Sequence, residues 1–134
     1  MIKEIDKVAW IQIVEGRILC ARSKGKDMYY LPGGKRESGE SDIDTLVREI
    51  REELSVRIKP ETEAYAGSFR AGAHGKSEGV QVTMSCYTAE YEGEINPAAE
   101  IEEIAWLTYE DRERVSEVCQ MIFDHLHELK KLAD

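Results

Sequence analysis

The chain has few cysteines, no long apolar run and a deficit of positive charge, and each shortage excludes a class of protein. Its three cysteines, Cys20, Cys86 and Cys119, are too few and too widely spaced for a zinc site or a disulfide framework, so we expect reduced packing residues. No stretch approaches the roughly 20 apolar residues of a membrane span, and the charged N-terminal segment lacks a signal peptide's apolar run. We therefore expect a cytoplasmic protein with no membrane association.

Acidic residues outnumber basic ones by 27 to 18, which gives a formal net charge of −9. Broad nucleic-acid binding needs a basic surface, so this balance argues against it. A small nucleotide substrate remains compatible, because metal ions can bridge carboxylates to phosphates. With 134 residues, 42% of them hydrophobic, the chain has the size and apolar content of a single domain over residues 1–134.

The most informative segment spans residues 34–56 and contains a predicted helix over residues 41–54. At about 100° per residue, one narrow apolar stripe forms from Ile43, Leu46, Val47, Ile50 and Leu54. Glu49, Glu52 and Glu53 gather on another flank, where like charges at i,i+3 and i,i+4 spacings repel. Such clustering favours a bound hard divalent cation, Mg²⁺ or Mn²⁺. The alternative is a solvated acidic face.

A glycine turn precedes this helix. Gly33 and Gly34 follow Pro32, and adjacent glycines let the backbone approach a ligand closely. Ser41 is a suitable N-cap for the helix. A loop of this kind, followed by a metal-binding helix, can hold a phosphate chain through cations and backbone N–H groups.

The segment resembles the Nudix box, the signature of the Nudix hydrolase family, whose pattern is G-x5-E-x7-R-E-U-x-E-E-x-G-U with U an aliphatic residue. Eight of nine defined positions match: Gly34, Glu40, Arg48, Glu49, Ile50, Glu52, Glu53 and Val56. Ser55 stands where the family has glycine, after the helix, where glycine relieves a positive φ. This departure removes no charged group.

The resemblance implies the Nudix fold, an α/β/α sandwich with a mixed β-sheet flanked by helices, and the hydrophobic pattern agrees with it. We expect strands over residues 7–14, 17–21, 28–31, 56–58, 64–69, 80–90 and 103–107. Glu15 and Gly16 predict a hairpin turn, and residues 70–79 predict a loop. A last helix is expected from Thr108 to about Leu132, with an apolar face of Val115, Val118, Cys119, Ile122, Leu126 and Leu129.

The resemblance also implies hydrolysis of a nucleoside diphosphate linked to another moiety, by attack of an activated water on phosphorus. Cations are needed because negative charge builds on the phosphate oxygens. The expected metal ligands are Glu49, Glu52, Glu53 and the carbonyl of Gly33, joined by Glu100 unless that residue is a solvated charge. The general base is Glu52, Glu53 or an acid from elsewhere in the chain.

Arg48 matches the family arginine, which is expected to orient the catalytic glutamates by ion pairing. Glu40 is its expected partner, and ordinary helix-surface charge is the alternative for both. Substrate contacts are expected from the glycine turn and the later loop, at Gly34, Lys35, His74 and Lys76, with solvent exposure as the alternative for the last two.

Family substrates include normal and oxidised nucleoside triphosphates, ADP-ribose and other sugar nucleotides, dinucleoside polyphosphates, coenzyme A and capped RNA. A proline marks some ADP-ribose subfamilies after the box, and a tyrosine marks dinucleoside polyphosphate ones. Residues 70–73 contain neither. A nucleoside triphosphate, normal or modified, cleaved to monophosphate and pyrophosphate is therefore the favoured substrate. The alternatives are hydrolysis of ADP-ribose, a nucleotide sugar or a dinucleoside polyphosphate, and non-catalytic nucleotide sensing. Hydrolysis of RNA 5′ ends would need a basic groove. A homodimer is possible because many relatives dimerise.

Overall fold

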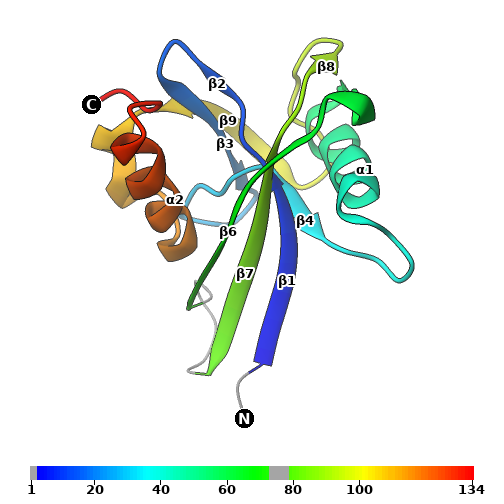
Figure 1. Cartoon of the computed structure of the whole chain (residues 1–134), viewed down its shortest axis with the longest axis horizontal. Coiled ribbons are helices and arrows are strands. Elements are labelled where there is room, and N and C mark those ends of the chain that lie inside the picture. Colours follow the sequence, from blue (N-terminus) through cyan, green and yellow to red (C-terminus); the bar gives the residue numbers. More distant parts are fainter. Residues whose placement is uncertain (1–2, 73–78) are drawn as a thin grey trace.

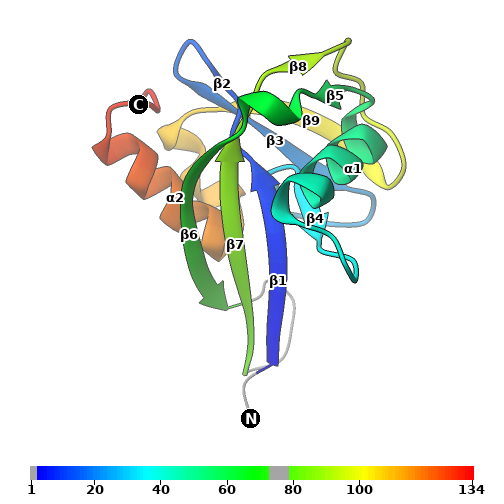
Figure 2. The same cartoon turned by 45° about the vertical axis from the view of Figure 1, so that its right-hand side comes forward.

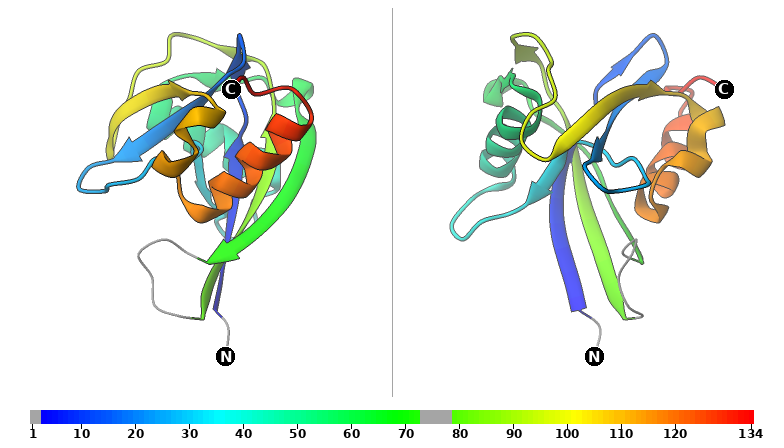
Figure 3. Two further views of the ribbon diagram at one scale, coloured as in Figure 1. Left: turned by 90° about the vertical axis from the view of Figure 1, so that its left-hand side faces the viewer. Right: turned by 180° about the vertical axis from the view of Figure 1, so that it is seen from behind.

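A four-stranded mixed sheet stands between two helices in the computed structural model, which describes residues 3–72 and 79–134. Figure 1 shows helix α1 (Asp42–Leu54) on one side of this sheet and helix α2 (Glu117–Glu128) on the other. In Figure 3 the right view again shows the helices on opposite sides, and the left view shows α2 in front and α1 behind. The expected α/β/α sandwich is confirmed. No helix in the described part of the chain has the length and apolar character needed to cross a bilayer.

The central sheet has the strand order β4–β1–β7–β6. Its strands are β1 (Lys3–Trp10), β4 (Gly33–Lys35), β6 (Ala64–Gly72) and β7 (Val80–Thr88). Strands β1 and β7 are parallel, whereas β4 pairs antiparallel with β1 and β6 pairs antiparallel with β7. This order places the glycine turn, which forms β4, at the sheet edge beside α1.

Two smaller sheets complete the fold (Figure 2). The first is antiparallel and contains β2 (Ile13–Val14), β3 (Arg17–Ser23) and β9 (Ile101–Leu107). The second pairs β5 (Arg57–Ile58) with β8 (Tyr91–Glu92). Glu15 and Gly16, with φ of 51° and 78°, join β2 to β3, so the predicted hairpin turn is confirmed.

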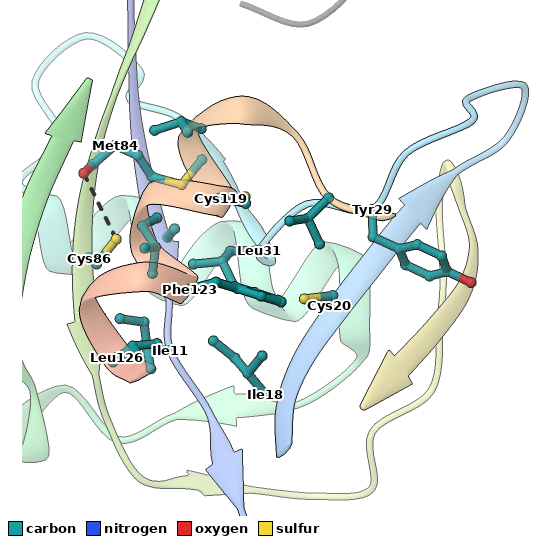
Figure 4. Close-up of a cluster of buried hydrophobic side chains, with 14 of the residues drawn as sticks. Ile11, Ile18, Cys20, Tyr29, Leu31, Met84, Cys86, Cys119, Phe123 and Leu126 are labelled. Carbon is teal, nitrogen blue, oxygen red and sulfur yellow. Dashed lines mark hydrogen bonds between the residues drawn. The ribbon is translucent and has the colours of Figure 1, made fainter. Parts of the chain in front are cut away.

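Alternate residues of β1 enter two separate cores, because successive strand side chains point to opposite faces of a sheet. Val8 and Trp10 pack with the buried residues of α1, whereas Ala9 packs with those of α2. Figure 4 shows the α2-side core around Phe123. All three cysteines are buried in it without a disulfide bond, as predicted.

Helix α1 forms as its sequence predicts. Ser41 is the N-cap, and its hydroxyl accepts a hydrogen bond from the Asp44 N–H while the Asp44 carboxylate accepts one from the Ser41 N–H, each at 3.2 Å. Leu46, Ile50 and Leu54 are fully buried. The predicted apolar stripe therefore docks α1 on the sheet and fixes the direction of its glutamates.

The long C-terminal helix was predicted wrongly. Residues Tyr109–Arg114 form a short 3₁₀ helix capped by Thr108, and α2 begins only at Glu117, after Ser116. The break at Val115 arises because Tyr29 bonds to both sides of it: its N–H donates to the Arg114 carbonyl and its carbonyl accepts from the Ser116 N–H. Extended backbone there buries Val115, and Leu129 is left half exposed.

Other boundaries also differ from the prediction. The strand expected over residues 7–14 is divided between β1 and β2, which belong to different sheets. Residues 28–31 form isolated bridges at Tyr29 and Tyr30 rather than a strand. The predicted loop over 70–79 begins later, because Arg70 to Gly72 continue β6. His74 and Lys76, the expected substrate contacts in this loop, lie outside the described residues.

Candidate active site

A cleft of about 400 Å³ lies beside the edge of the central sheet where β4 meets α1. It is lined by five of the residues that the sequence predicted to bind metal or substrate at this point: Gly33, Gly34, Glu49, Glu53 and Glu100. We call these five residues the acidic end of the cleft. Lys35, another predicted substrate contact, also lines it.

Glu53 is the most deeply placed of the carboxylates, with 8% of the residue exposed. Its Oε1 accepts a hydrogen bond from the Gly33 N–H at 3.0 Å. The pKa of Glu53 is raised to about 8, chiefly by burial and also by the charges of Glu49 and Glu100, while the Gly33 bond and the charge of Lys7 act to lower it. The ionised form of this carboxyl group is poorly stabilised by its surroundings, and a bound cation would stabilise it.

The two glycines of β4 leave room for different neighbours, backbone beside Gly33 and a side chain beside Gly34. A Cβ on Gly33 would lie 2.0 Å from the Val8 carbonyl oxygen, and the φ of Gly33 is +147°. A Cβ on Gly34 would lie 2.4 Å from Cδ of Glu49. The missing side chains therefore make the space into which the Glu49 carboxylate is directed.

Arg48 holds the Glu49 carboxylate from the solvent side. Its Nη1 donates to Glu49 Oε1 at 2.8 Å, while Nε and Nη2 donate to the two oxygens of Glu40 at 2.7 and 2.9 Å. The bidentate arginine holds the pKa of Glu40 at about 2. Glu40 also accepts hydrogen bonds from the Glu37 N–H and the Thr45 hydroxyl. Arg48 thus links the loop before α1 to a carboxylate of the cleft.

Glu52 differs from its two neighbours. Its side chain is 56% exposed, lies 3.7 Å from Arg48 and lines an outer groove of α1 instead of the cleft. Among the described residues, no three acidic, histidine or cysteine side chains converge closely enough to hold a metal ion. Binding of one ion by all three glutamates would therefore require Glu52 to turn inward.

Glu100 reaches the acidic end from the loop before β9. The Glu100 carbonyl accepts a hydrogen bond from the Lys24 N–H at 2.8 Å, which fixes this loop against the end of β3. The charge of Glu100 raises the pKa of both Glu49 and Glu53. The distant acid thus lies within electrostatic reach of the helix glutamates.

The donors at the acidic end fit a hard divalent cation. The donors are the carboxylate oxygens of the glutamates and the backbone carbonyls of the glycine turn. Mg²⁺ and Mn²⁺ prefer oxygen ligands of these kinds. Glu49, like Glu53, has a pKa raised chiefly by burial. A divalent ion would relieve the repulsion between these carboxylates.

The sequence did not identify several other residues that line the cleft, among them Lys7, Lys26 and Ser116. The sequence around Lys7 did contain a signal for its position. Ile5 and Ala9, two residues before and after it, are apolar, so Lys7 is a charged residue on the apolar face of a strand. Ser116 carried none, because it lay inside the helix predicted from Thr108.

A family model of the NUDIX domain matches residues 5–119. The chain belongs to the Nudix family. A MutT NUDIX hydrolase from Burkholderia pseudomallei shares the Nudix fold, with a TM-score of 0.76 and 19% identity over 91% of this chain and 97% of that one. The expected family and a Nudix hydrolase domain are therefore confirmed.

Two curated relatives match shorter stretches of this Nudix domain. An RNA pyrophosphohydrolase of Halorhodospira halophila is 39% identical over 56 residues, 42% of this chain and 30% of that protein. The 8-oxo-dGDP phosphatase NUDT18 of Homo sapiens is 38% identical over 61 residues, 46% of this chain and 17% of that protein. The chain thus aligns with less than a third of each relative.

Proposed function

We propose that the Nudix domain is a Mg²⁺- or Mn²⁺-dependent pyrophosphohydrolase that cleaves a nucleoside triphosphate, normal or modified, to a monophosphate and pyrophosphate. The observation that carries the proposal is the acidic end, where buried Glu53 and partly buried Glu49 line the cleft together with Glu100 and the glycine turn. Family membership supports action on nucleoside diphosphate derivatives.

Each residue of the acidic end has a role in this proposal. Glu49, Glu53, Glu100, the Gly33 carbonyl and an inward-turned Glu52 would hold the cation. When bound, the ion would neutralise phosphate charge and acidify the attacking water. Glu52 or Glu53 accepts the proton of that water, and Arg48 keeps Glu49 oriented through its bond at 2.8 Å.

The substrate fits the rest of the cleft. A volume of about 400 Å³ lies in the usual range for small-molecule sites. Lys35 and Lys26 line the cleft with the carboxylates, and their ammonium groups suit phosphate oxygens. The names of the two curated relatives, a pyrophosphohydrolase and a phosphatase of an oxidised nucleoside diphosphate, support phosphoanhydride hydrolysis of this kind.

A release assay with Mg²⁺ or Mn²⁺ tests the proposal. The panel contains normal and oxidised nucleoside triphosphates, ADP-ribose, nucleotide sugars, dinucleoside polyphosphates and 5′-triphosphorylated RNA. We expect pyrophosphate release from a triphosphate, and loss of it on chelation and in Glu53→Gln. Faster turnover of ADP-ribose, a nucleotide sugar, a dinucleoside polyphosphate or RNA would replace the substrate assignment. Nucleotide binding without turnover by the folded protein would indicate a sensing module.

A further inference from the structure

Besides the acidic end, the cleft has a second group of lining residues, most of them from β1, β7 and the start of α2. We call it the lysine end and define it by the lining residues Lys7, Tyr30, Val82, Met84, Ser116 and Val118. Val82, Met84 and Val118 belong to the α2-side core. The walls of this end are thus largely apolar, and its polar groups are few.

Lys7 brings a positive charge to the lysine end, within electrostatic reach of Glu53 and Glu49. Its side chain is half buried, and it forms no ion pair with any described residue. Its ammonium group lies over the ring of Tyr30, with Nζ 5.8 Å from the ring centroid. Burial lowers the pKa of Lys7. An ammonium group held in this way gains free energy from any hydrogen-bond acceptor that enters the cleft.

Ser116 brings an unsatisfied hydroxyl to the same end. The residue is 2% exposed, and its Oγ is the one fully buried side-chain polar atom without a hydrogen-bond partner in ranges 3–72 and 79–134. A serine at an N-cap normally bonds a backbone N–H of its own helix, but this one does not. The nearby Cys119 thiol is only a weak partner. Buried polar groups left unpaired in this way call for an explanation.

Both groups favour the same kind of ligand atom. An ammonium group is only a donor, a serine hydroxyl donates readily, and the N-terminus of α2 adds backbone N–H groups and a partial positive charge. The carboxylate of Glu117, which approaches Gly72, is the negative charge in the first turn of this helix. An acceptor oxygen on a flat, otherwise apolar group would therefore match the lysine end.

We propose that the lysine end binds the nucleobase and selects keto bases, with Lys7 and Ser116 as the specificity-determining residues. The selected oxygen is at C6 of a purine or C4 of a pyrimidine. Adenine and cytosine carry an amino donor there, which would face donors. The inference rests on the proposed function in one respect: if the phosphates bind at the acidic end, the lysine end is the part of the cleft that remains for the base.

Calorimetric binding of monophosphates to the full chain without metal tests this selection. Inosine and adenosine monophosphates form the purine pair, and uridine and cytidine monophosphates the pyrimidine pair. The wild-type protein should bind each keto member at least about tenfold more tightly, since a site built for one hydrogen-bonding pattern rejects the other strongly. Lys7→Met should reduce the ratio to within about threefold by weakening the keto ligand, and Ser116→Ala should reduce it by about threefold.

Matched controls separate this effect from general damage. Lys3→Met changes an exposed lysine of the same strand, and Ser68→Ala an exposed serine of β6, both outside the cleft. Neither should alter the ratio. Lys7→Gln provides a second variant if Lys7→Met lowers the melting temperature.

Equal wild-type affinities for the members of each pair, or a ratio that survives both Lys7 substitutions, would overturn the inference. Failure of this inference can be distinguished from failure of the proposed function. Triphosphate turnover without base preference removes only the base assignment. A preference that depends on Lys7, found in a protein that hydrolyses none of the panel, keeps the base assignment and removes the proposed reaction.

Discussion

The two ends of the cleft differ in their ionisable groups, which are carboxyl groups at the acidic end and the Lys7 ammonium at the lysine end. At the acidic end Glu53 is buried beside Glu49 with a single backbone N–H bond to Gly33. At the lysine end Lys7 is half buried, and its ammonium group lies over the ring of Tyr30. The cleft is therefore complementary to a ligand that has an anionic, cation-binding part and a neutral part rich in hydrogen-bond acceptors.

The ends also differ in how rigidly they are built. The acidic end combines close packing at Gly33 and Gly34 with the Arg48 bonds to Glu40 and Glu49. The lysine end has apolar walls and single polar groups from β1 and α2. This difference implies that substitutions at the acidic end change the reaction, whereas those at the lysine end change the choice of substrate.

The largest effect is expected from Glu53→Gln. Loss of a ligand or base charge should lower kcat/KM for the best triphosphate by about 10³-fold, within the range for removal of acid–base catalysis. Glutamine preserves the acceptor for the Gly33 N–H, so the fold should persist by circular dichroism. Retention of more than a tenth of wild-type activity would contradict the importance of the acidic end.

A smaller loss is expected from Gly34→Ala. The added Cβ would meet Cδ of Glu49, the end of a flexible side chain, so the carboxylate should move while the fold stays intact. Misplacement of a catalytic group by about 1 Å costs on the order of 10²-fold in rate. Steady-state kinetics together with an unchanged melting temperature would verify this. Full activity would show that the position of Glu49 is not critical.

The raised pKa of Glu53 predicts a pH-dependent stability difference in the protein without metal. Its folded pKa of about 8 exceeds the ordinary value of 4.5, so ionisation of Glu53 opposes folding at high pH. The cost is present above about pH 8 and disappears as the pH falls toward 4.5. Glu53→Gln should therefore be more stable than wild type at pH 8.5, by at least about 1 kcal/mol, and nearly equal at pH 4.5.

Urea unfolding in chelator at the two pH values measures this difference. Glu37→Gln, which changes an exposed carboxylate outside the cleft, is the matched control. An equal stability gain at both pH values would show that charge burial is not the cause.

The smallest effect is expected from Ser55→Gly, just after the helix that carries the acidic glutamates. Ser55 has φ +66°, a left-handed conformation that glycine adopts more easily. The substitution should stabilise the fold by about 0.5 kcal/mol and leave kcat/KM and base preference unchanged. Ser55→Ala, which keeps the strain and loses the 3.2 Å hydrogen bond to the Asn96 carbonyl, should destabilise it. Denaturant midpoints measure both, and a less stable glycine variant would contradict the strain argument.

The acidic end could be located from sequence because four of its five residues lie in one short segment. Helical periodicity placed Glu49 and Glu53 together, and the family pattern added Gly33 and Glu100. The periodicity grouped Glu52 with them, but β4 lies beside the flank that carries Glu49 and Glu53, so Glu52 stays exposed. Burial of a particular glutamate depends on tertiary packing that spacing does not encode.

The lysine end could not be predicted because its residues come from distant parts of the chain. Lys7, Met84 and Ser116 meet only once β1 pairs with β7 and α2 packs on the sheet. Ser116 was assigned to a helix interior because local propensity does not reveal the Tyr29 bonds that interrupt the helix at Val115.

Product analysis of triphosphate turnover, with and without Mg²⁺, tests the role of the acidic end. We predict monophosphate and pyrophosphate in equal amounts from wild-type protein with Mg²⁺, and neither product after chelation or with Glu53→Gln. Turnover that continues unchanged in Glu53→Gln would contradict the assignment of catalysis to this end of the cleft. So would the absence of metal-dependent cleavage of any phosphoanhydride by folded wild-type protein.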